Sequence, residues 1–403
     1  MKTKLFFIAI AGLFTSMVSA ADLYVRDAGA GGSFSTISAA IAQASDGDRI
    51  IIRPKAGNLP YVENLIINKS LTFVSETNFS KYILQGSISV TPEAGRTISI
   101  HNLQISGTGA ITVDAATVGG RTTLNIMNSF VAAVNAAQSN TTLNLSGCTG
   151  AAVTMTHGRC TGNKVNSILF SLQAGETHLS DDDIEIIANA IITTGGLGGN
   201  QKNYAVKIFN NYLTNGTIYI GGAKSDSFNE ITNNVIGSTT NTNTTLYSIW
   251  LNLDSESQSL YSIMNNVILK QSNSYATYYP VIASTYASTY VYYNVTNSNQ
   301  YNGSFIMPSV TNSGNNNAAV FSLNTTTYTV TGTGITDSGS PEDDYADIDL
   351  SRNDRGNGGG SNAWSNYWPT NADNKPQVNY LKTPRRIYTG TTEMNATGAG
   401  HSK

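Results

Sequence analysis

Short apolar runs broken by polar residues follow one another along most of this chain, and one pattern recurs between residues 184 and 296. In it, an apolar residue is followed by two variable residues, an asparagine, one variable residue and usually a second apolar residue. The asparagines are Asn189, Asn211, Asn234, Asn266 and Asn294, which lie 22, 23, 32 and 28 residues apart. A repeat of this length indicates a solenoid or a propeller.

The runs inside each unit have the period of a β-strand. Residues 217–220 and 248–253 alternate apolar with other side chains, as half-buried strands do. A propeller blade would need about 40 residues for four antiparallel strands. Two or three short strands per unit, joined by Asn, Gly, Ser and Thr, instead favour parallel coils in which equivalent residues lie over one another.

Such stacking explains the repeated asparagine. Asn and Gly tolerate the left-handed backbone conformation of a tight turn better than other residues do. Stacked asparagine side chains can also hydrogen-bond one another and the backbone of neighbouring coils, as ladders do in cross-β stacks. We therefore expect the five asparagines to be structural, and Asn211 and Asn234 to be buried in one shared turn column.

The first part of the chain adds a strand, a helix and a second strand before the coils. They are expected at Tyr24-Val25, at residues 34–44 and at residues 47–52. With these elements the chain resembles a right-handed parallel β-helix of the pectin-lyase-like superfamily over residues 22–330. The resemblance implies an all-β solenoid and does not by itself imply a function.

The resemblance and the pattern together divide the chain into four parts. Residues 1–20 carry Lys2 and Lys4, an apolar run and small residues before Ala21, as a secretory signal peptide does. Residues 21–60 are expected to form an N-terminal cap, with the amphipathic helix 34–44, begun by Ser33 or Ser35, over the open end. Residues 61–330 would form the β-helix and residues 331–403 a C-terminal capping segment or tail.

The C-terminal part contains many of the charges of the protein. The run of residues 347–356, Asp-Ile-Asp-Leu-Ser-Arg-Asn-Asp-Arg-Gly, resembles a closing segment of other exported bacterial β-helix proteins. It is therefore expected to close the far end of the stack through an Asp/Arg network. Calcium is the alternative, because this cluster could supply six or more oxygen ligands if the tail folds tightly.

Composition narrows the classes of function. Charged residues make up 12% of the sequence, about half the ~25% of an average globular protein, and the net charge is −3. A nucleic-acid partner would need a basic face, so none is expected. After the signal peptide no apolar run is long enough to span a membrane. The two cysteines, Cys148 and Cys160, are expected to form a disulfide in an exported chain.

Catalytic residues of the superfamily do not carry over onto this sequence. Its hydrolytic members resemble one another in Asn-x-Asp, Asp-Asp, His-Gly and Arg-x-Lys, in this chain order. Here His157-Gly158 precedes the acidic run Asp181-Asp182-Asp183, and Arg53-Pro54-Lys55 lies far upstream. His157 and the three aspartates remain the catalytic candidates of a polysaccharide lyase or glycoside hydrolase, and Asp254-x-Glu256 is a further carboxylate pair.

Aromatic residues of the later coils point to a different function. By alternation Tyr219 and Trp250 face outward, since Ile218, Ile220, Ile249 and Leu251 face inward. Together with Tyr279, Tyr290 and Tyr292 they would form an apolar surface with polar edges, which suits sugar rings. We expect a secreted or cell-surface protein that binds a neutral glycan without a cofactor. In the alternatives these tyrosines only shield the sheet, and the rod itself is the function.

Overall fold

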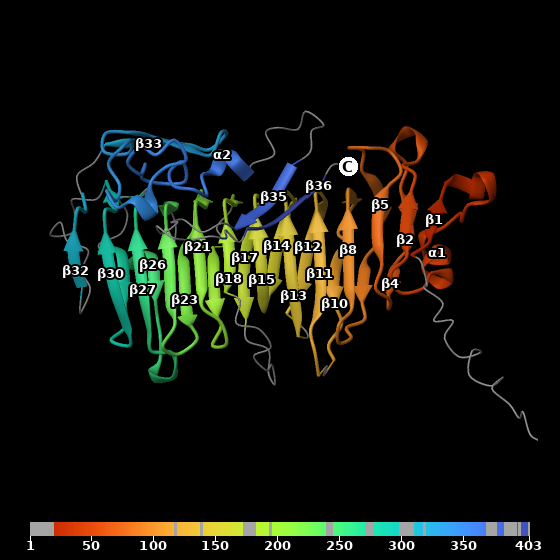
Figure 1. Ribbon diagram of the computed structural model, residues 1–403, viewed down its shortest axis with the longest axis horizontal. Helices are drawn as coiled ribbons and strands as arrows, with labels where there is room; N and C mark the ends of the chain where they lie inside the picture. The colour runs from red at the N-terminus through yellow and green to blue at the C-terminus, as the bar shows by residue number, and fades with distance from the viewer. Residues whose placement is uncertain are drawn as a thin grey trace, which may run out of the picture.

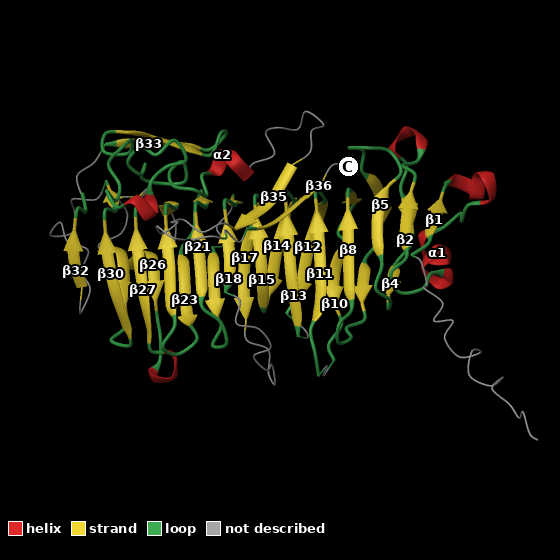
Figure 2. Cartoon of the chain, viewed as in Figure 1, coloured by secondary structure: helices red, strands yellow, loops and turns green. Residues whose placement is uncertain are grey.

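The chain forms an elongated, solenoid-like stack of parallel β-strands with few helices (Figures 1 and 2). The computed structural model describes residues 20–116, 119–137, 140–171, 183–192, 196–238, 245–270, 277–297, 310–316, 320–367, 377–382, 393 and 396–401. Residues 1–19, Asp181 and Asp182 lie outside this range, so the expected signal peptide and most of the acidic run are not described.

Within the described residues, one sheet of 13 strands runs the length of the stack, and every pairing in it is parallel. Its strands are, in spatial order, β1 (Asp22–Val25), β2 (Arg49–Ile52), β5 (Thr72–Ser75), β8 (Thr97–His101), β11 (Thr122–Met127), β13 (Thr141–Ser146), β15 (His157–Thr161), β18 (Ile184–Ile187), β21 (Val206–Phe209), β24 (Phe228–Thr232), β27 (Ser259–Met264), β30 (Ala287–Tyr292) and β32 (Val310–Ser313). We call it the first sheet.

A second parallel sheet consists of two rows of strands that share β12 (Phe130–Ala136) and β14 (Thr149–Met155). The turn row follows the first sheet directly and also contains β3 (Tyr61–Val62), β6 (Tyr82–Gln85), β9 (Leu103–Ile105), β16 (Lys164–Val165), β19 (Ala190–Ile191), β22 (Tyr212–Leu213), β25 (Val235–Ser238), β28 (Val267–Lys270) and β31 (Val295–Thr296). The outer row also contains β4 (Leu65–Ile67), β7 (Ile88–Val90), β10 (Ala110–Val113), β17 (Ser167–Ser171), β20 (Leu197–Asn200), β23 (Ile218–Gly222), β26 (Thr245–Leu251) and β29 (Thr277–Ala283).

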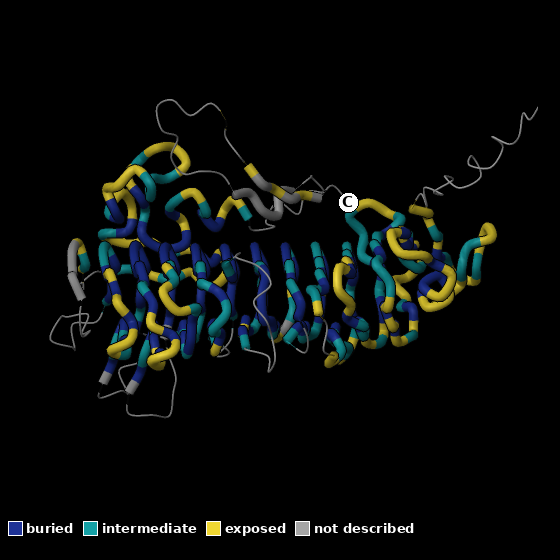
Figure 3. The backbone as a smooth tube through the Cα atoms, turned by 60° about the horizontal axis from the view of Figure 1, so that its bottom comes forward, coloured by how far each residue is buried: buried dark blue, intermediate teal, exposed yellow. Residues whose placement is uncertain are grey.

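Alternating side chains build the core. In β11 and β13 the leucine and isoleucine positions pair in register and are buried, while Asn125 and Asn144 between them face outward. One inward column continues through Ile100, Ile126, Leu145, Cys160, Ile186, Ile208, Ile231, Ile263 and Val291. Each buried aliphatic side chain contributes roughly 1.5–3 kcal/mol, so stacking converts the repeat into stability. In Figure 3 exposed residues lie mainly on the turns around the strands.

The N-terminal part is not separated from the stack, because β1 and β2 are the first two strands of the first sheet. The expected boundary at residue 61 is therefore not a break in the sheet. The helix of this part, α1 (Ile37–Gln43), packs against β1, β2 and β4. It is shorter than expected, and its first turn is capped by the Thr36 hydroxyl, which accepts from the N–H of Ala39 at 3.2 Å, rather than by a serine.

Two charged side chains hold the ends of α1. The Glu63 carboxylate accepts the N–H groups of Ile37 and Ser38 at 2.8 and 2.9 Å. At the other end, Lys69 Nζ donates to the carbonyls of Ile41 and Ala42 at 3.0 Å. A negative group at the first turn and a positive group at the last both stabilise a helix dipole.

The repeated asparagines form a continuous ladder between the first sheet and the turn row, as predicted. Asn211 and Asn234 are both fully buried, and the Oδ1 of Asn234 accepts the backbone N–H and Nδ2 of Asn211 at 2.9 and 3.0 Å. The same pair of bonds joins each neighbouring rung of a ladder made of Asn163, Asn189, Asn211, Asn234, Asn266, Asn294 and Asn315. The sequence pattern missed the first and last of these residues.

The left-handed backbone conformation belongs to a different column, and this part of the prediction was wrong. The residue directly before each ladder asparagine has φ near +55°, as at Asn210, Asn233 and Asn265. Glycine, alanine or tyrosine takes this position in other coils, at Gly162, Ala188, Tyr293 and Gly314. The ladder asparagine is thus selected for hydrogen bonding, and its predecessor for the turn.

The expected disulfide is not formed, since Cys148 and Cys160 are both free and buried. Cys160 belongs to the inward aliphatic column, between Leu145 and Ile186. Cys148 lies instead in the turn, where its N–H donates to Asn163 Oδ1 at 2.9 Å. The two side chains therefore serve different columns. Burial raises the pKa of the Cys148 thiol to about 12, which keeps it protonated and unreactive.

The described part of the C-terminal region lies along the side of the stack and not over its far end (Figure 1). It contains the antiparallel pair β33 (Phe321–Asn324) and β34 (Thr329–Gly332) and the short helix α2 (Trp364–Tyr367). A second antiparallel pair follows, β35 (Gln377–Lys382) with β36 (Thr397–His401). The prediction that the C-terminal part closes the far end is thus wrong for α2, β35 and β36. The antiparallel strand β33 and the start of β34 fall within residues 61–330, which were expected to form the β-helix.

The left-handed residues that precede the ladder asparagines make polar contacts with the C-terminal segment, residues 320–367. Asn233 Nδ2 donates to Asn353 Oδ1 at 3.0 Å, and Asn265 Oδ1 accepts the N–H of Ser340 at 2.8 Å. The buried guanidinium of Arg355 donates to the carbonyls of Gly314 and Gly334 at 2.8 and 3.2 Å. Left-handed turn residues therefore hold the returning chain, which explains why asparagine is frequent there as well.

An apolar cluster completes the contact. The outward side chains Ile187 and Phe209 of the first sheet are 4% and 7% exposed, because Tyr328, Ile335 and Trp364 of the C-terminal segment pack over this region. The rings of Tyr328 and Trp364 meet edge to face at 5.7 Å. We call this covered surface the turn side.

Candidate functional site

Four aromatic side chains gather on the outside of the outer row. Tyr219 of β23 and Trp250 of β26 pair in register, and their ring centroids are 5.0 Å apart at an interplanar angle of 64°. Tyr247 lies 5.0 Å from Trp250 and is stacked on Tyr279 of β29 at 5.8 Å and 14°. Tyr219 and Trp250 are partly exposed. We call this group the aromatic platform.

Buried neighbours fix the direction of these rings. Ile218 and Ile220 flank Tyr219, Ile249 and Leu251 flank Trp250, and all four aliphatic residues are fully buried. A pleated strand that buries residues i and i+2 must turn the residue between them outward. The rigid core of the stack thus holds the platform, and the aromatic spacing follows from the spacing of the coils.

Tyr247 was missed because β26 departs from strict alternation. Ser248 and Ile249 are both buried, so Tyr247 and Trp250 face outward although they are three residues apart. The Ser248 hydroxyl lies 2.9 Å from the hydroxyl of the buried Tyr278, which explains a polar residue at this inward position. The sequence carries no signal for this break in alternation.

Two residues of the platform, Tyr219 and Trp250, are part of one outward column that runs along the whole outer row. From the N-terminal end the paired residues are Ile66, Ser89, Thr112, Asn135, Thr154, Leu169, Gly198, Tyr219, Trp250 and Ile282. The column is mainly hydroxyl and amide in the early coils and aromatic in the later ones. A linear ligand lying along the axis would therefore cross a polar track and then reach the rings.

Gly198 is the one position of this column without a side chain. A Cβ placed on it would lie 1.8 Å from the carbonyl oxygen of Tyr219, and its φ is +130°. A side chain is thus excluded by the backbone of the next coil. Gly198 therefore stands, without a side chain, between the exposed Leu169 and Tyr219 in this column.

Two of the five residues predicted to bind ligand lie elsewhere. Tyr290 and Tyr292 belong to β30 of the first sheet, where their rings stack on each other at 6.1 Å. Tyr290 is 46% exposed. The expected group is therefore split between two sheets, and only Tyr219, Trp250 and Tyr279 are brought together.

The structure places His157 in a packing role. Its side chain is 3% exposed, its ring lies 4.3 Å from the ring of Tyr204, and Nδ1 is 3.3 Å from the Thr142 hydroxyl. Arg121 bonds the hydroxyl of Tyr204, and its guanidinium lies 5.5 Å from the ring centroid. The histidine thus faces an aromatic ring and a hydroxyl in this arrangement.

Asp183, the described member of the acidic run, adjoins a row of alternating charges on the first sheet. Arg159, Glu185, Lys207 and Glu230 pair in register across four coils. Arg159 Nε lies 2.6 Å from Glu185 Oε2, and Lys207 Nζ lies 2.9 Å from Glu230 Oε2 and 3.9 Å from Asp183 Oδ2. Opposite signs on adjacent rungs avoid the repulsion that like charges would cause.

The remaining carboxylate pair is also engaged. Lys202 Nζ lies 2.7 Å from Asp254 Oδ2 and 2.8 Å from Glu256 Oε2. The hydrogen bond from Lys202 lowers the pKa of Asp254, so this carboxyl does not hold a proton for general acid catalysis near neutral pH. Among the described residues, no group of three or more His, Cys, Asp and Glu side chains could hold a metal ion.

In the part of the chain that the structure describes, no helix has both the length and the apolar character needed to cross a membrane. Comparisons of this chain with protein-family models, with curated proteins and with solved structures find no match.

Proposed function

We propose that this chain is an exported, non-catalytic, right-handed parallel β-helix protein that binds a neutral glycan on its aromatic platform. In this proposal α1 closes the N-terminal end of the solenoid, and the protein serves at the cell surface or in the extracellular matrix. The contact of Tyr219 with Trp250 on adjacent coils carries the proposal, because it forms a partly exposed aromatic surface with a fixed spacing.

Sugar rings present faces of C–H groups and edges of hydroxyls, which match the apolar face and polar rim of an aromatic platform. Thr154 and Asn135 continue the column with a hydroxyl and an amide, which can bond the edges of further sugar units. Each coil contributes one residue to the column, so a longer glycan would contact more residues and bind with higher affinity.

Charge favours a neutral ligand. The outward column contains no charged residue, and the nearby Lys202 is paired with both Asp254 and Glu256. A uronate chain would need cations to balance its carboxylates, and the column offers none. The alternative of a polysaccharide lyase or hydrolase finds less support, because His157 and Asp183 are engaged in other contacts.

The test compares the two aromatic pairs of the later coils. Tyr219→Ala with Trp250→Ala removes two of the four rings of the platform, at about 1 kcal/mol per ring, so binding to an immobilised neutral polysaccharide should weaken by roughly 30-fold. Tyr290→Ala with Tyr292→Ala removes a stacked pair on the first sheet and is the matched control, which should bind as the wild type does.

Binding would be measured by affinity electrophoresis against β-glucan, xyloglucan, xylan and polygalacturonate. Equal retention of both double variants in every gel would refute the platform as the site. Release of new reducing ends or of unsaturated uronate from any of these polymers would favour the enzyme instead.

A further inference from the structure

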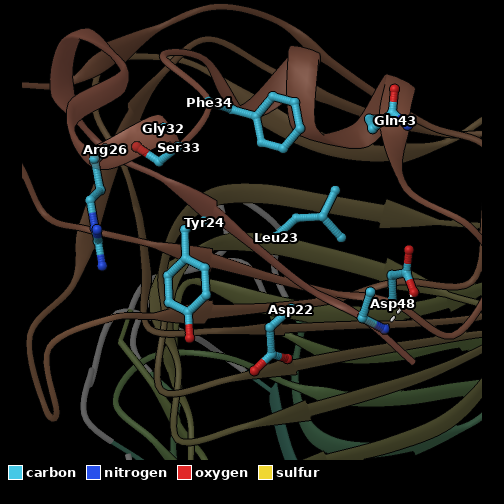
Figure 4. Close-up of a pocket in the computed structure, with 11 residues that line it drawn as sticks. Asp22, Leu23, Tyr24, Arg26, Gly32, Ser33, Phe34, Gln43 and Asp48 are labelled. Carbon is cyan, nitrogen blue, oxygen red and sulfur yellow. Dashed lines mark hydrogen bonds between the residues drawn. The ribbon is translucent and has the colours of Figure 1, made fainter. Parts of the chain in front are cut away.

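Asp48 is a buried carboxylate at the edge of the first sheet. Asp48 is only 5% exposed, and its Oδ2 accepts the backbone N–H of Ser45 at 2.7 Å. Its other oxygen, Oδ1, accepts the backbone N–H of Ala21, also at 2.7 Å (Figure 4). In the described part of the chain no basic side chain forms an ion pair with it. A buried carboxylate without a counter-charge is costly, so this environment calls for a cation.

The backbone nitrogen that donates to Asp48 is that of Ala21, which would become the free amino group after cleavage by a signal peptidase. Val18-Ser19-Ala20 places small residues at the positions that such an enzyme reads, and cleavage after Ala20 makes the nitrogen of Ala21 an ammonium group. Ala20 and Ala21 are both exposed, and a hollow of about 420 Å³ lies beside them, lined by residues of 21–34 together with Gln43 and Asp48 (Figure 4). The start of the mature chain therefore has space around it.

The strand that begins there is held at the edge of the sheet. The carbonyl of Ala21 accepts the N–H of Arg49 at 2.8 Å, and Arg49 is paired with Asp22 at 2.7 Å. β1 pairs with β2 on one side only, apart from a single bridge to Phe34. The contact between Ala21 and Asp48 thus fixes the first residue of an edge strand, where strands otherwise fray.

We propose that Ala21 is the amino terminus of the mature protein and that its ammonium group forms a partly buried ion pair with Asp48, which locks β1 onto the stack after export. The uncut precursor has only a neutral amide donor at this position, so cleavage converts a hydrogen bond from a neutral N–H to the carboxylate into a contact between opposite charges. This inference rests on the proposed export and not on glycan binding, so a failed binding experiment leaves it standing.

The first measurement is the mass and the N-terminal sequence of the exported protein, which should begin at Ala21. The second compares residues 21–403 with a free or an acetylated amino terminus, each with Asp48 or with Asp48→Asn. Acetylation replaces the ammonium group by a neutral amide and removes the attraction between opposite charges, so it should lower the folded-to-unfolded ratio roughly fivefold to tenfold in the wild type. With Asp48→Asn, acetylation should have no further effect.

A readout independent of unfolding is the reaction of the α-amine with an acylating reagent. It should be slower in the folded wild type than in a short peptide with the same first residues. A mature chain that begins elsewhere would overturn the inference. So would an acetylation effect that is equal in the wild type and in the Asp48→Asn variant, or an amine that reacts as fast as the peptide.

Discussion

The turn side and the aromatic platform are two apolar surfaces on the outside of the same stack, and the residues that the structure describes cover only the first of them. On the turn side, Phe209 is 7% exposed because Tyr328, Ile335 and Trp364 return along the stack. On the platform, Trp250 and its three aromatic neighbours contact one another, and Tyr219 and Trp250 stay partly exposed. Internal packing explains the first surface, whereas the second has the geometry of a binding surface.

Loosening the C-terminal segment that covers the turn side should have the largest effect on stability. Trp364→Ala deletes a buried ring from the contact with Tyr328, at about 3 kcal/mol or more by analogy with core truncations. Residues 320–367 should then become accessible to protease, and a dye that binds apolar surface should bind more strongly. Glycan binding should be unchanged, since the platform belongs to a different row. Loss of binding together with protection of the segment would show that the two surfaces are not independent.

Breaking the asparagine ladder tests how much the hydrogen bonds inside the stack contribute to its stability, separately from the C-terminal segment outside it. Asn234→Ala leaves the N–H of Asn211 without its acceptor and removes the bonds to Asn266 and to the carbonyl of Ile208. The free energy of unfolding should fall by about 3 kcal/mol. Urea unfolding measures it, with Asn252→Ala, an exposed asparagine, as the control that should change stability by less than ~0.5 kcal/mol. Equal losses in both variants would contradict the ladder.

The smallest expected effect is the pH dependence of stability that comes from two carboxyl groups of the C-terminal segment. Burial raises the pKa values of Asp347 and Asp354 in the C-terminal segment. A carboxyl with a raised pKa in the folded state stabilises that state while it is protonated. This stability is lost as the pH rises from about 4, the unfolded value, through the folded pKa.

Replacing both residues by asparagine should remove this loss. Relative to the wild type, the thermal unfolding midpoint of Asp347→Asn with Asp354→Asn should therefore rise as the pH increases from about 4, the unfolded pKa, to about 7. A difference between the two proteins that is constant over this range, or that falls, would show that the burial of these carboxyls does not act on stability.

The stack could be predicted from the sequence because its signals are local and repeated. The asparagine spacing, and the inward positions around Tyr219 and Trp250, depend on one residue and its neighbours. What could not be predicted depends on contacts between distant residues. The return of residues 320–367 along the turn side depends on bonds such as Asn233 to Asn353, which no local pattern encodes.

The candidate site shows the same division. Alternation predicts that Tyr219 and Trp250 face outward, but it cannot assign strands to rows, so Tyr290 and Tyr292 were grouped with them. Tyr247 was missed because β26 departs from strict alternation. The cysteines were misinterpreted for a related reason. Composition and compartment favour a disulfide, whereas the columns that Cys148 and Cys160 occupy are decided by register.

The central claim, that the platform holds a neutral glycan, is tested most directly at Trp250 itself. The chain has three tryptophans, so Trp364→Phe with Trp368→Phe leaves Trp250 as the only tryptophan. Titration with soluble β-glucan, xyloglucan, xylan and polygalacturonate should change its emission in a saturable way for at least one of the three neutral polymers, and Tyr219→Ala should weaken that response. Emission that stays constant with every neutral polymer, or that changes only with polygalacturonate, would contradict the account.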